Sequence, residues 1–374
     1  MQTTHVGSLP RSDELSSLLI AKDNEQPYDE NRFETVVQDS IDQAVEKQVT
    51  AGVSIVSDGE MGKVGYSTYM TERLEGFGGH VDRKPAKDLA AHPDLAKKLA
   101  AMMGSQEFVR ASCIGPVKLK NLQPAFDDIQ RFKLALERHG NGVRAFMNAA
   151  SPGLITAFQQ NRHYPSHETY LADLVIAMRP EYEAIIDAGL DLQFDCPDLA
   201  MARHTGFQDA SDPEFIKIAE ANIEALNAAT DGLPRERMRM HICWGNYEGP
   251  HDCDIPLDKV IHLLMNANPS ILLFEAANPR HEHEWTVWES TDIPDNKILA
   301  PGCIDTCSNY VEHPQLISQR LQRFIDIVGE ERVIASTDCG FGTFAGYGKI
   351  DPEVAWKKLK NLREGADLAV KKVA

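Results

Sequence analysis

The sequence predicts a closed (β/α)8 barrel with extra helices inserted after its second and third strands. Short apolar or β-branched runs recur along the chain, separated by longer segments with helical periodicity. Eight such runs alternating with helices favour a closed parallel barrel. A doubly wound open sheet is the alternative, but residues 7–11 after the first run are not a glycine-rich phosphate-binding turn.

The expected elements follow the chain in a regular order. The expected strands are Thr3–Gly7, Val53–Ser57, Val109–Ile114, Leu190–Phe194, Met238–Cys243, Ile271–Glu275, Ile298–Gly302 and Val333–Thr337. The expected helices include Arg32–Ala51, Glu168–Ala188, Pro213–Thr230, Pro256–Asn266, Pro314–Val328 and Pro352–Leu368. Several begin with a capping residue before a proline, as at Asp351, which is typical of a helix start.

The length fits one elaborated barrel. A typical barrel needs roughly 250 residues. The surplus falls mainly between the second and third expected strands and between the third and fourth, where extra helices are expected to form a cap. We therefore expect residues 1–374 to form a single catalytic domain.

The charge and the cysteines restrict the possible partners and the compartment. Lys and Arg number 38 against 56 Asp and Glu, for a formal charge of −18, which disfavours nucleic acid and anionic membrane surfaces. No apolar run is long enough to span a bilayer, and the N-terminus does not resemble a signal peptide. The seven cysteines favour metal-binding or reactive thiols in a reducing compartment, so we expect a cytoplasmic protein.

Polar residues stand at the ends of most of the expected strands. Barrel active sites are built at the carboxyl ends of the strands and in the loops that follow. The residues at these positions are His5, Ser8, Asp58, Glu60, Asp195, His241, Cys243, Glu275, Asp305, Asp338 and Cys339. Stability alone does not explain so many polar strand ends, so we expect an active site there.

Four of these residues predict a metal site. His241 and Cys243 are two apart on one strand, so their side chains point to the same face. Glu275 ends the next strand and Cys339 the last. Imidazole, carboxylate and two thiolates suit tetrahedral Zn²⁺. If His241 and Cys243 are considered without Glu275 and Cys339, the alternative is that they are two buried residues of one strand that make only local hydrogen bonds.

The donor set also indicates a reaction class. Two thiolates and a carboxylate around Zn²⁺ give a formal charge of −1, which makes a poor Lewis acid for splitting water. Such a site is suited to hold a substrate thiol as a nucleophilic thiolate, because metal binding deprotonates thiols. The residues therefore favour alkyl transfer onto a thiol.

The same residues resemble a known family. The segments Thr4–Arg11, Asp58–Glu60, Leu192–Asp195, His241–Cys243, Glu275 and Ser336–Gly340 are similar to the catalytic barrel of cobalamin-independent methionine synthase. The resemblance runs from residue 3 to about residue 345, and the family's N-terminal folate-associated barrel has no counterpart in the chain.

The resemblance implies roles for individual residues. Zinc would be held by His241, Cys243, Glu275 and Cys339, and the amino-acid part of homocysteine by Ser8, Glu60 and Asp195. Arg11 follows the first strand and is a further candidate for substrate binding.

Two positions depart from the family pattern. Cys196 stands where the family has Glu, and Cys307 stands where the family has a His that assists the folate leaving group. An acid near Asp305 or His5 is expected to take that role. The methyl donor stays open between a folate and a corrinoid.

Three functions stay open at this point. The favoured one is a zinc-dependent S-methyltransferase acting on homocysteine, similar to 5-methyltetrahydropteroyltriglutamate–homocysteine methyltransferase. The second is alkyl transfer to a metal-bound thiolate, as in epoxyalkane:coenzyme M transferase. The third is a non-catalytic protein that binds zinc or a thiol, because four protein ligands can also close a structural zinc site.

Overall fold

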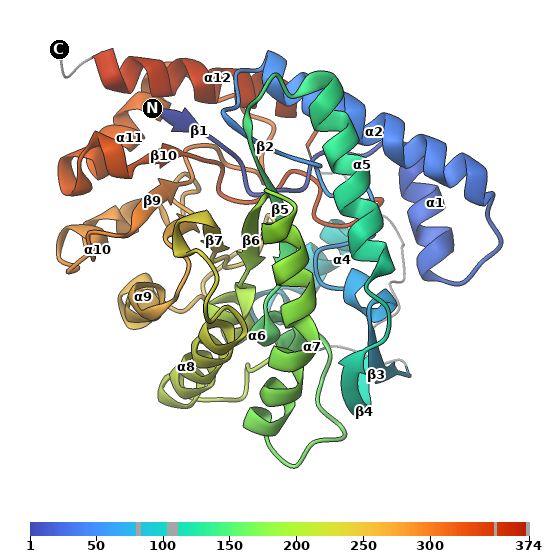
Figure 1. The fold of residues 1–374 in the computed structure, drawn as a ribbon. Helices are drawn as coiled ribbons and strands as arrows, with labels where there is room; N and C mark the ends of the chain where they lie inside the picture. Colours follow the sequence, from blue (N-terminus) through green and yellow to red (C-terminus); the bar gives the residue numbers. More distant parts are fainter. Residues whose placement is uncertain (80–83, 103–110, 348–349, 372–374) are drawn as a thin grey trace.

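A parallel barrel forms the centre of the molecule (Figure 1). The computed structural model describes residues 1–79, 84–102, 111–347 and 350–371. Six parallel strands pair in the order β2-β5-β6-β7-β8-β9. The barrel strands are β1 (Gln2–Thr3), β2 (Ile55–Ser57), β5 (Arg144–Ala150), β6 (Asp191–Asp195), β7 (Met238–His241), β8 (Ile271–Phe274), β9 (Ile298–Pro301) and β10 (Ile334–Ala335).

Pairing between the first and last strands closes the sheet. β1 pairs with β10 in parallel, Gln2 opposite Ile334. Parallel bridges such as Leu299 to Val333 join β9 to the β10 segment. The Ser54 N–H donates to the Thr3 carbonyl at 3.0 Å and joins β1 to β2. The expected (β/α)8 barrel is therefore confirmed.

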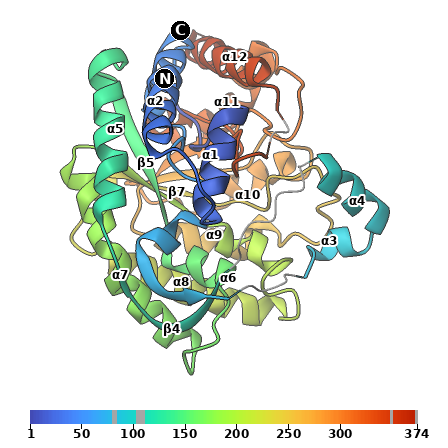
Figure 2. The same cartoon turned by 90° about the vertical axis from the view of Figure 1, so that its right-hand side faces the viewer.

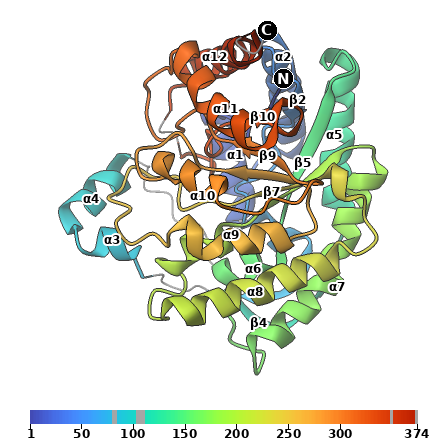
Figure 3. The same cartoon turned by 90° about the vertical axis from the view of Figure 1, so that its left-hand side faces the viewer.

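Helices surround the strands on all sides (Figures 1 and 3). They are α1 (Asp13–Asp23), α2 (Glu30–Thr50), α5 (Gln123–His139), α6 (Pro152–Phe158), α7 (His167–Asp187), α8 (Asp212–Ala229), α9 (Leu257–Asn266), α10 (Trp285–Glu289), α11 (Pro314–Val328) and α12 (Pro352–Lys371). Local sequence fixes several starts: Ser211 and Glu214 form a capping box at α8, and the Asp29 side chain caps α2. No helix in the described part of the chain is long and apolar enough to cross a bilayer.

The third barrel strand was predicted in the wrong place. The expected strand Val109–Ile114 begins outside the described residues and otherwise overlaps β4 (Ser112–Leu119), which pairs antiparallel with β3 (Leu74–Gly78) outside the barrel. The barrel strand is β5, whose sequence RAFMNAA has no β-branched residue. Burial on both faces, rather than β propensity, makes this segment a strand.

The extra helices follow the second and third barrel strands, as expected. The connection from β2 to β5 contains α3 (Lys87–Ala90) and α4 (Pro93–Met102), which project to one side of the barrel (Figures 2 and 3). After β5, the short helix α6 precedes α7. The insertion after β2 contacts the barrel through Asp88 of α3. This residue is buried and accepts from the hydroxyl of Tyr247, in the loop after β7, at 2.7 Å.

The barrel interior has its own apolar cluster. Val6, Ile55, Phe146, Leu273 and Ile334 are among its members. The Arg239 guanidinium lies 3.7 Å from the centre of the Phe146 ring and donates to the Thr4 hydroxyl and the His5 carbonyl. A buried cation is thus paired with an aromatic face and neutral acceptors, and these contacts join β5 to β7 and β1.

We expect Phe146→Ala to lower the free energy of unfolding by about 3–5 kcal/mol, because it removes a fully buried ring and leaves a cavity. Phe126→Ala is the matched control, since Phe126 is 47% exposed on α5 and should change the stability by about 0.5 kcal/mol. Urea unfolding followed by circular dichroism measures both. Equal losses in the two variants would contradict the barrel position of Phe146.

Candidate metal centre and substrate pocket

A pocket of about 340 Å³ lies at the carboxyl ends of the barrel strands. Its polar lining includes Ser8 after β1, Glu60 after β2 and Asp195 at the end of β6. His241, Cys243 and Cys339 line it from β7 and from the loop after β10. Parallel strands bring their carboxyl ends to one edge of the barrel, so residues far apart in sequence meet here.

His241, Cys243 and Cys339 form a buried group that could hold a metal ion. One ligand atom of each lies within 4.8 Å of the others. The two Sγ atoms are 3.2 Å apart, and the Cys339 Sγ lies 3.8 Å from Nε2 of His241. Two thiolates on one tetrahedral zinc are about 3.8 Å apart, so binding would require only a small separation of the sulfurs.

Glu275 borders this group but is held by other contacts. Its Oε1 lies 3.8 Å from the Cys339 Sγ and accepts from the Trp244 N–H at 2.8 Å. Its Oε2 accepts from the Asn278 amide at 2.6 Å. The structure thus brings three of the four predicted ligands into one group and places Glu275 against one of them.

The charge state of the thiols fits a cation site. The hydrogen bond with Cys243, together with burial, raises the pKa of the Cys339 thiol well above its ordinary value. Without a cation, the Cys339 thiol therefore stays protonated at neutral pH. A divalent ion at this point would supply the charge that lets both thiols ionise and coordinate.

The His241 ring lies among three neighbours. Its Nδ1 lies 3.6 Å from Oδ1 of Asp195, while its Nε2 lies 3.0 Å from the Asp338 carbonyl oxygen and 3.8 Å from the Cys339 sulfur, so metal binding would replace the contact with Asp338. Metal-binding histidines commonly direct their second nitrogen at a carboxylate, which fixes the ring and its tautomer. Asp195 therefore connects the metal-capable group to the rest of the pocket.

A set of buried acceptors surrounds Asp195. Amide groups of Asn148 and Gln193 donate to its two oxygens at 3.0 and 3.4 Å. The opposite amide oxygens of these two residues, together with Oε2 of Glu60, are buried and accept no hydrogen bond from any described group. Several acceptors without donors favour a ligand that brings N–H groups and positive charge.

Glu60 is held in an unusual electrostatic setting. Burial, followed by the nearby charge of Asp195, raises the pKa of Glu60 to about 8. Its backbone is left-handed, with φ of 58°, and its side chain lies beside Gly7. A Cβ on Gly7 would lie 2.6 Å from Oε1 of Glu60, so the glycine is needed for this close approach.

Asn148 and Gln193 were missed by sequence reasoning. Asn148 lies on β5, the strand that was placed elsewhere, and a polar residue within RAFMNAA is the signal that could have identified it. Asp338 was seen only as a strand end. Its carboxylate accepts from the N–H groups of Ala276, Ala277 and Asn278 and so fixes the loop that follows Glu275.

Comparison with known proteins agrees with this arrangement. The profile of a family described as the catalytic domain of cobalamin-independent synthase matches residues 1–86. A methionine synthase from Thermococcus kodakarensis is 22% identical over 100% of this chain and 95% of its own length. One from Sulfolobus acidocaldarius is 23% identical over 98% of this chain and 91% of its own length.

The chain is thus similar to the catalytic domain of cobalamin-independent methionine synthases over its first 86 residues, and to methionine synthases over its whole length. A 2-hydroxypropyl-CoM lyase from Xanthobacter autotrophicus is 27% identical over 43% of this chain and 50% of its own length. The structure of a B12-independent methionine synthase from Shewanella sp. W3-18-1, in complex with selenomethionine, superposes with a TM-score of 0.71 at 20% identity. It covers 99% of this chain and 98% of the other, and shows the shared fold.

Three residues predicted to act as the acid or to bind substrate lie away from the pocket lining. His5 is buried and hydrogen-bonded to Gln48 at 2.7 Å, and burial lowers the pKa of His5 to about 4. His5 is therefore uncharged at neutral pH. The Asp305 carboxylate accepts from the Cys307 N–H and the Ser308 hydroxyl. The Arg11 guanidinium donates to the carbonyls of Gly342, Glu60 and Lys63, so it braces loops.

Ser8 does line the pocket and packs tightly against the loop after β10. The Gly342 N–H lies 3.4 Å from its Oγ, and the Phe341 N–H donates to its carbonyl at 2.8 Å. A Cβ on Gly340 would lie 2.0 Å from the Ser8 Oγ, so this close packing needs glycine beside Cys339.

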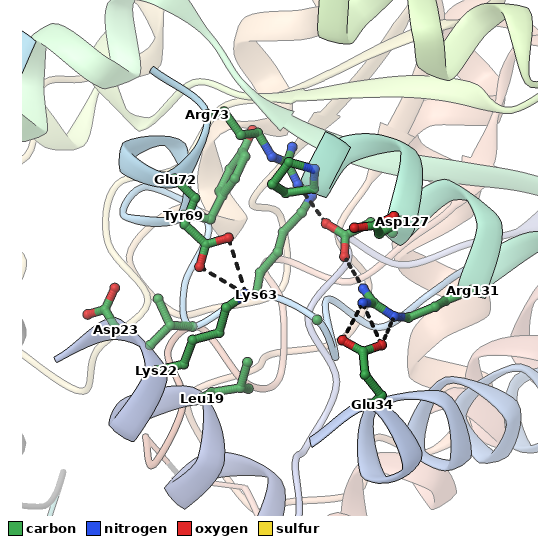
Figure 4. A pocket seen from close by; sticks show the side chains of 14 residues that line it. Leu19, Lys22, Asp23, Glu34, Lys63, Tyr69, Glu72, Arg73, Asp127 and Arg131 are labelled. Carbon is green, nitrogen blue, oxygen red and sulfur yellow. Dashed lines mark hydrogen bonds and ion pairs between the residues drawn. The ribbon is translucent and has the colours of Figure 1, made fainter. Parts of the chain in front are cut away.

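A second pocket, of about 110 Å³, lies near α1, α2 and α5 (Figure 4). Its charged side chains are largely paired with one another. Lys22 pairs with Glu72 and Arg131 with Glu34, and buried Arg73 pairs with Asp128. These pairs brace the segment after β2 against the outer helices, and we place the candidate site in the larger pocket.

We expect Glu60→Gln to gain stability relative to the wild type as the pH rises from about 5 to about 8. The folded-state pKa of Glu60 lies above its unfolded value, so folding favours the protonated form and the wild type loses this stability as pH rises through that range. Urea unfolding across the pH range measures the difference. Glu46→Gln, at an exposed site, is the control: its unfolding free energy should differ from that of the wild type by the same amount at every pH. If the difference for Glu60→Gln were also independent of pH, the raised pKa of Glu60 would be contradicted.

Proposed function

We propose that this protein is a zinc-dependent S-methyltransferase that methylates the thiol of homocysteine to give methionine. The observation that carries the proposal is the group of His241, Cys243 and Cys339 facing the same pocket as Glu60 and Asp195. Full-length relatives named methionine synthase support it. We further propose that residues 1–374 act as one catalytic unit in a reducing, cytoplasmic setting, because metal-binding thiols have to stay reduced.

The metal role falls to residues that already converge. His241, Cys243 and Cys339 would hold the ion, and Glu275 would join them by a small movement of its carboxylate toward the sulfurs. When bound, zinc would supply the positive charge that keeps a substrate thiol deprotonated near pH 7. Asp195 would keep the His241 ring in place through the contact of 3.6 Å.

The acceptor groups suit the amino-acid part of homocysteine. An ammonium group would pair with Asp195 and Glu60, which line the pocket. The arriving positive charge favours ionised Glu60, so binding should release a proton from it at neutral pH. The Ser8 hydroxyl lines the same pocket and would donate to the substrate carboxylate.

A second candidate function is alkyl transfer to a different thiol. The relative named 2-hydroxypropyl-CoM lyase favours it, although that match covers only 43% of this chain. A sulfonate thiol needs cationic partners, whereas the Asp195 carboxylate puts negative charge in this pocket and Glu60 adds more when it ionises. The carboxylates therefore favour the amino acid.

We expect the purified protein to hold about one zinc ion per chain, and Cys243→Ser and Cys339→Ser to lose it. Cys253→Ser is the matched control, because Cys253 lies outside the metal-capable group. Metal analysis and zinc-edge absorption measure the outcome. Homocysteine should add one sulfur to the zinc environment; an unchanged sulfur count would leave only a structural zinc site and would refute thiol activation.

We expect Asp195→Asn to weaken homocysteine binding by about tenfold to a hundredfold, since it removes one charged partner of the ammonium group. Binding of propanethiol, which has no ammonium group, should change little and serves as the control. Calorimetry on the zinc-loaded protein measures both, and coenzyme M completes the panel. Tighter binding of coenzyme M than of homocysteine would favour the alkyl-transfer alternative.

A further inference from the structure

The part of the pocket beyond the metal-capable group has an aromatic wall, formed by Tyr66, Phe158, Phe344 and Tyr347. Tyr66 follows β2, Phe158 ends α6, and the other two rings follow β10. The Tyr66 ring centre lies 5.6 Å from Phe158 and 5.4 Å from Phe344, and Phe344 lies 6.1 Å from Tyr347. Rings from three separate strand-end segments thus gather at one pocket.

The backbone fixes this wall in place. Gly65 and Phe344 form an antiparallel bridge, and the Ala345 N–H donates to the Val64 carbonyl at 2.8 Å. A Cβ on Gly65 would lie 2.3 Å from the Phe344 ring, so the glycine lets the ring lie directly on the chain. The aromatic wall is therefore built into the loop structure.

The charge of the pocket favours a cation. Glu60 and Asp195 line it, and a thiolate acceptor would add negative charge. Among its described lining residues, Lys84 is the one lysine or arginine, and it is 66% exposed and paired with Asp209 at 2.6 Å. Aromatic faces within about 6 Å of a cation attract it, and quaternary onium groups are bound in this way.

The positions of the expected acids point in the same direction. His5 is uncharged at neutral pH and bonded to Gln48, while the Asp305 carboxylate is bonded to its own loop. A folate amine would need a proton as it leaves. When a methyl group is transferred from a sulfonium or quaternary ammonium centre, the leaving group is a neutral thioether or amine. Such a leaving group needs no proton.

We propose that the methyl donor is a small onium compound, a methylsulfonium or a methylated quaternary ammonium, bound against the aromatic wall; this rests on the proposed function. The acceptor sulfur donates a lone pair to the methyl carbon and forms the new C–S bond. The bond from that carbon to the onium atom breaks, and its electron pair stays on the onium sulfur or nitrogen, which leaves uncharged. The thiol proton has already gone to solvent, so atoms and charge balance.

Isosteric ligands test the recognition separately from turnover. Choline and neutral 3,3-dimethylbutan-1-ol have nearly the same shape, so calorimetry on the zinc-loaded protein isolates the charge. The dimethylsulfonium analogue of choline, which has one methyl group fewer, tests the sulfonium. We expect at least one of the two cations to bind about tenfold tighter than the alcohol. Phe344→Leu should remove this preference, while Phe344→Tyr and the surface control Phe126→Leu should keep it. Equal binding of the cations and the alcohol would overturn the proposal.

Turnover supplies the second readout. Methionine formation from homocysteine is measured with S-methylmethionine and glycine betaine as donors, beside methyltetrahydrofolate and methylcobalamin. We expect transfer from one of the two onium donors, and which one reacts distinguishes sulfonium from ammonium. Transfer from neither would overturn the proposal. Zinc-edge absorption reports separately whether homocysteine reaches the metal, so a failure of the donor proposal is distinguishable from a failure of the proposed function.

Discussion

The close approach of two buried cysteine sulfurs, 3.2 Å apart, to one histidine is the constraint around which the pocket is arranged. Burial keeps such thiols protonated unless a positive charge lies beside them. The barrel brings Cys243 and Cys339 together from separate strand ends and holds His241 between the sulfur of Cys339 and the carboxylate of Asp195. Ionisation of both thiols in this arrangement would therefore require a cation beside them.

Asp195 joins the two halves of the pocket. On one side it faces the imidazole that would bind metal, and on the other it accepts from the amides of Asn148 and Gln193. The same carboxylate raises the pKa of Glu60, after burial. The electrostatics of substrate binding and the orientation of a metal ligand are thus coupled through one side chain.

The barrel provides three different environments within one pocket. Sulfur and imidazole lie at or after the ends of β7 and β10. The carboxylates of Glu60 and Asp195 lie at or after the ends of β2 and β6, and the aromatic rings lie in the segments that follow β2, β5 and β10. This order would suit a reaction in which a sulfur nucleophile lies between an anchored polar group and a methyl donor held by the aromatic rings. The inserted α3 closes one side through Asp88 and Tyr247.

The sequence by itself determined the fold class, six of the helices (α2, α7, α8, α9, α11 and α12) and the three residues of the metal-capable group. Helical periodicity and capping residues are local signals, and the ends of α2, α7, α8 and α11 differ from expectation by at most two residues. The two-residue spacing of His241 and Cys243 could also be read directly from the sequence.

Only the tertiary structure decided which segment is the third barrel strand, because Arg144–Ala150 lacks β-branched residues and becomes a strand through burial. The same applies to side-chain direction: Asn148 and Gln193 lie beside Asp195, whereas His5 and Asp305 are committed to Gln48 and to their own loop. A strand end fixes where a side chain starts, but packing and hydrogen bonding across the barrel fix where it points.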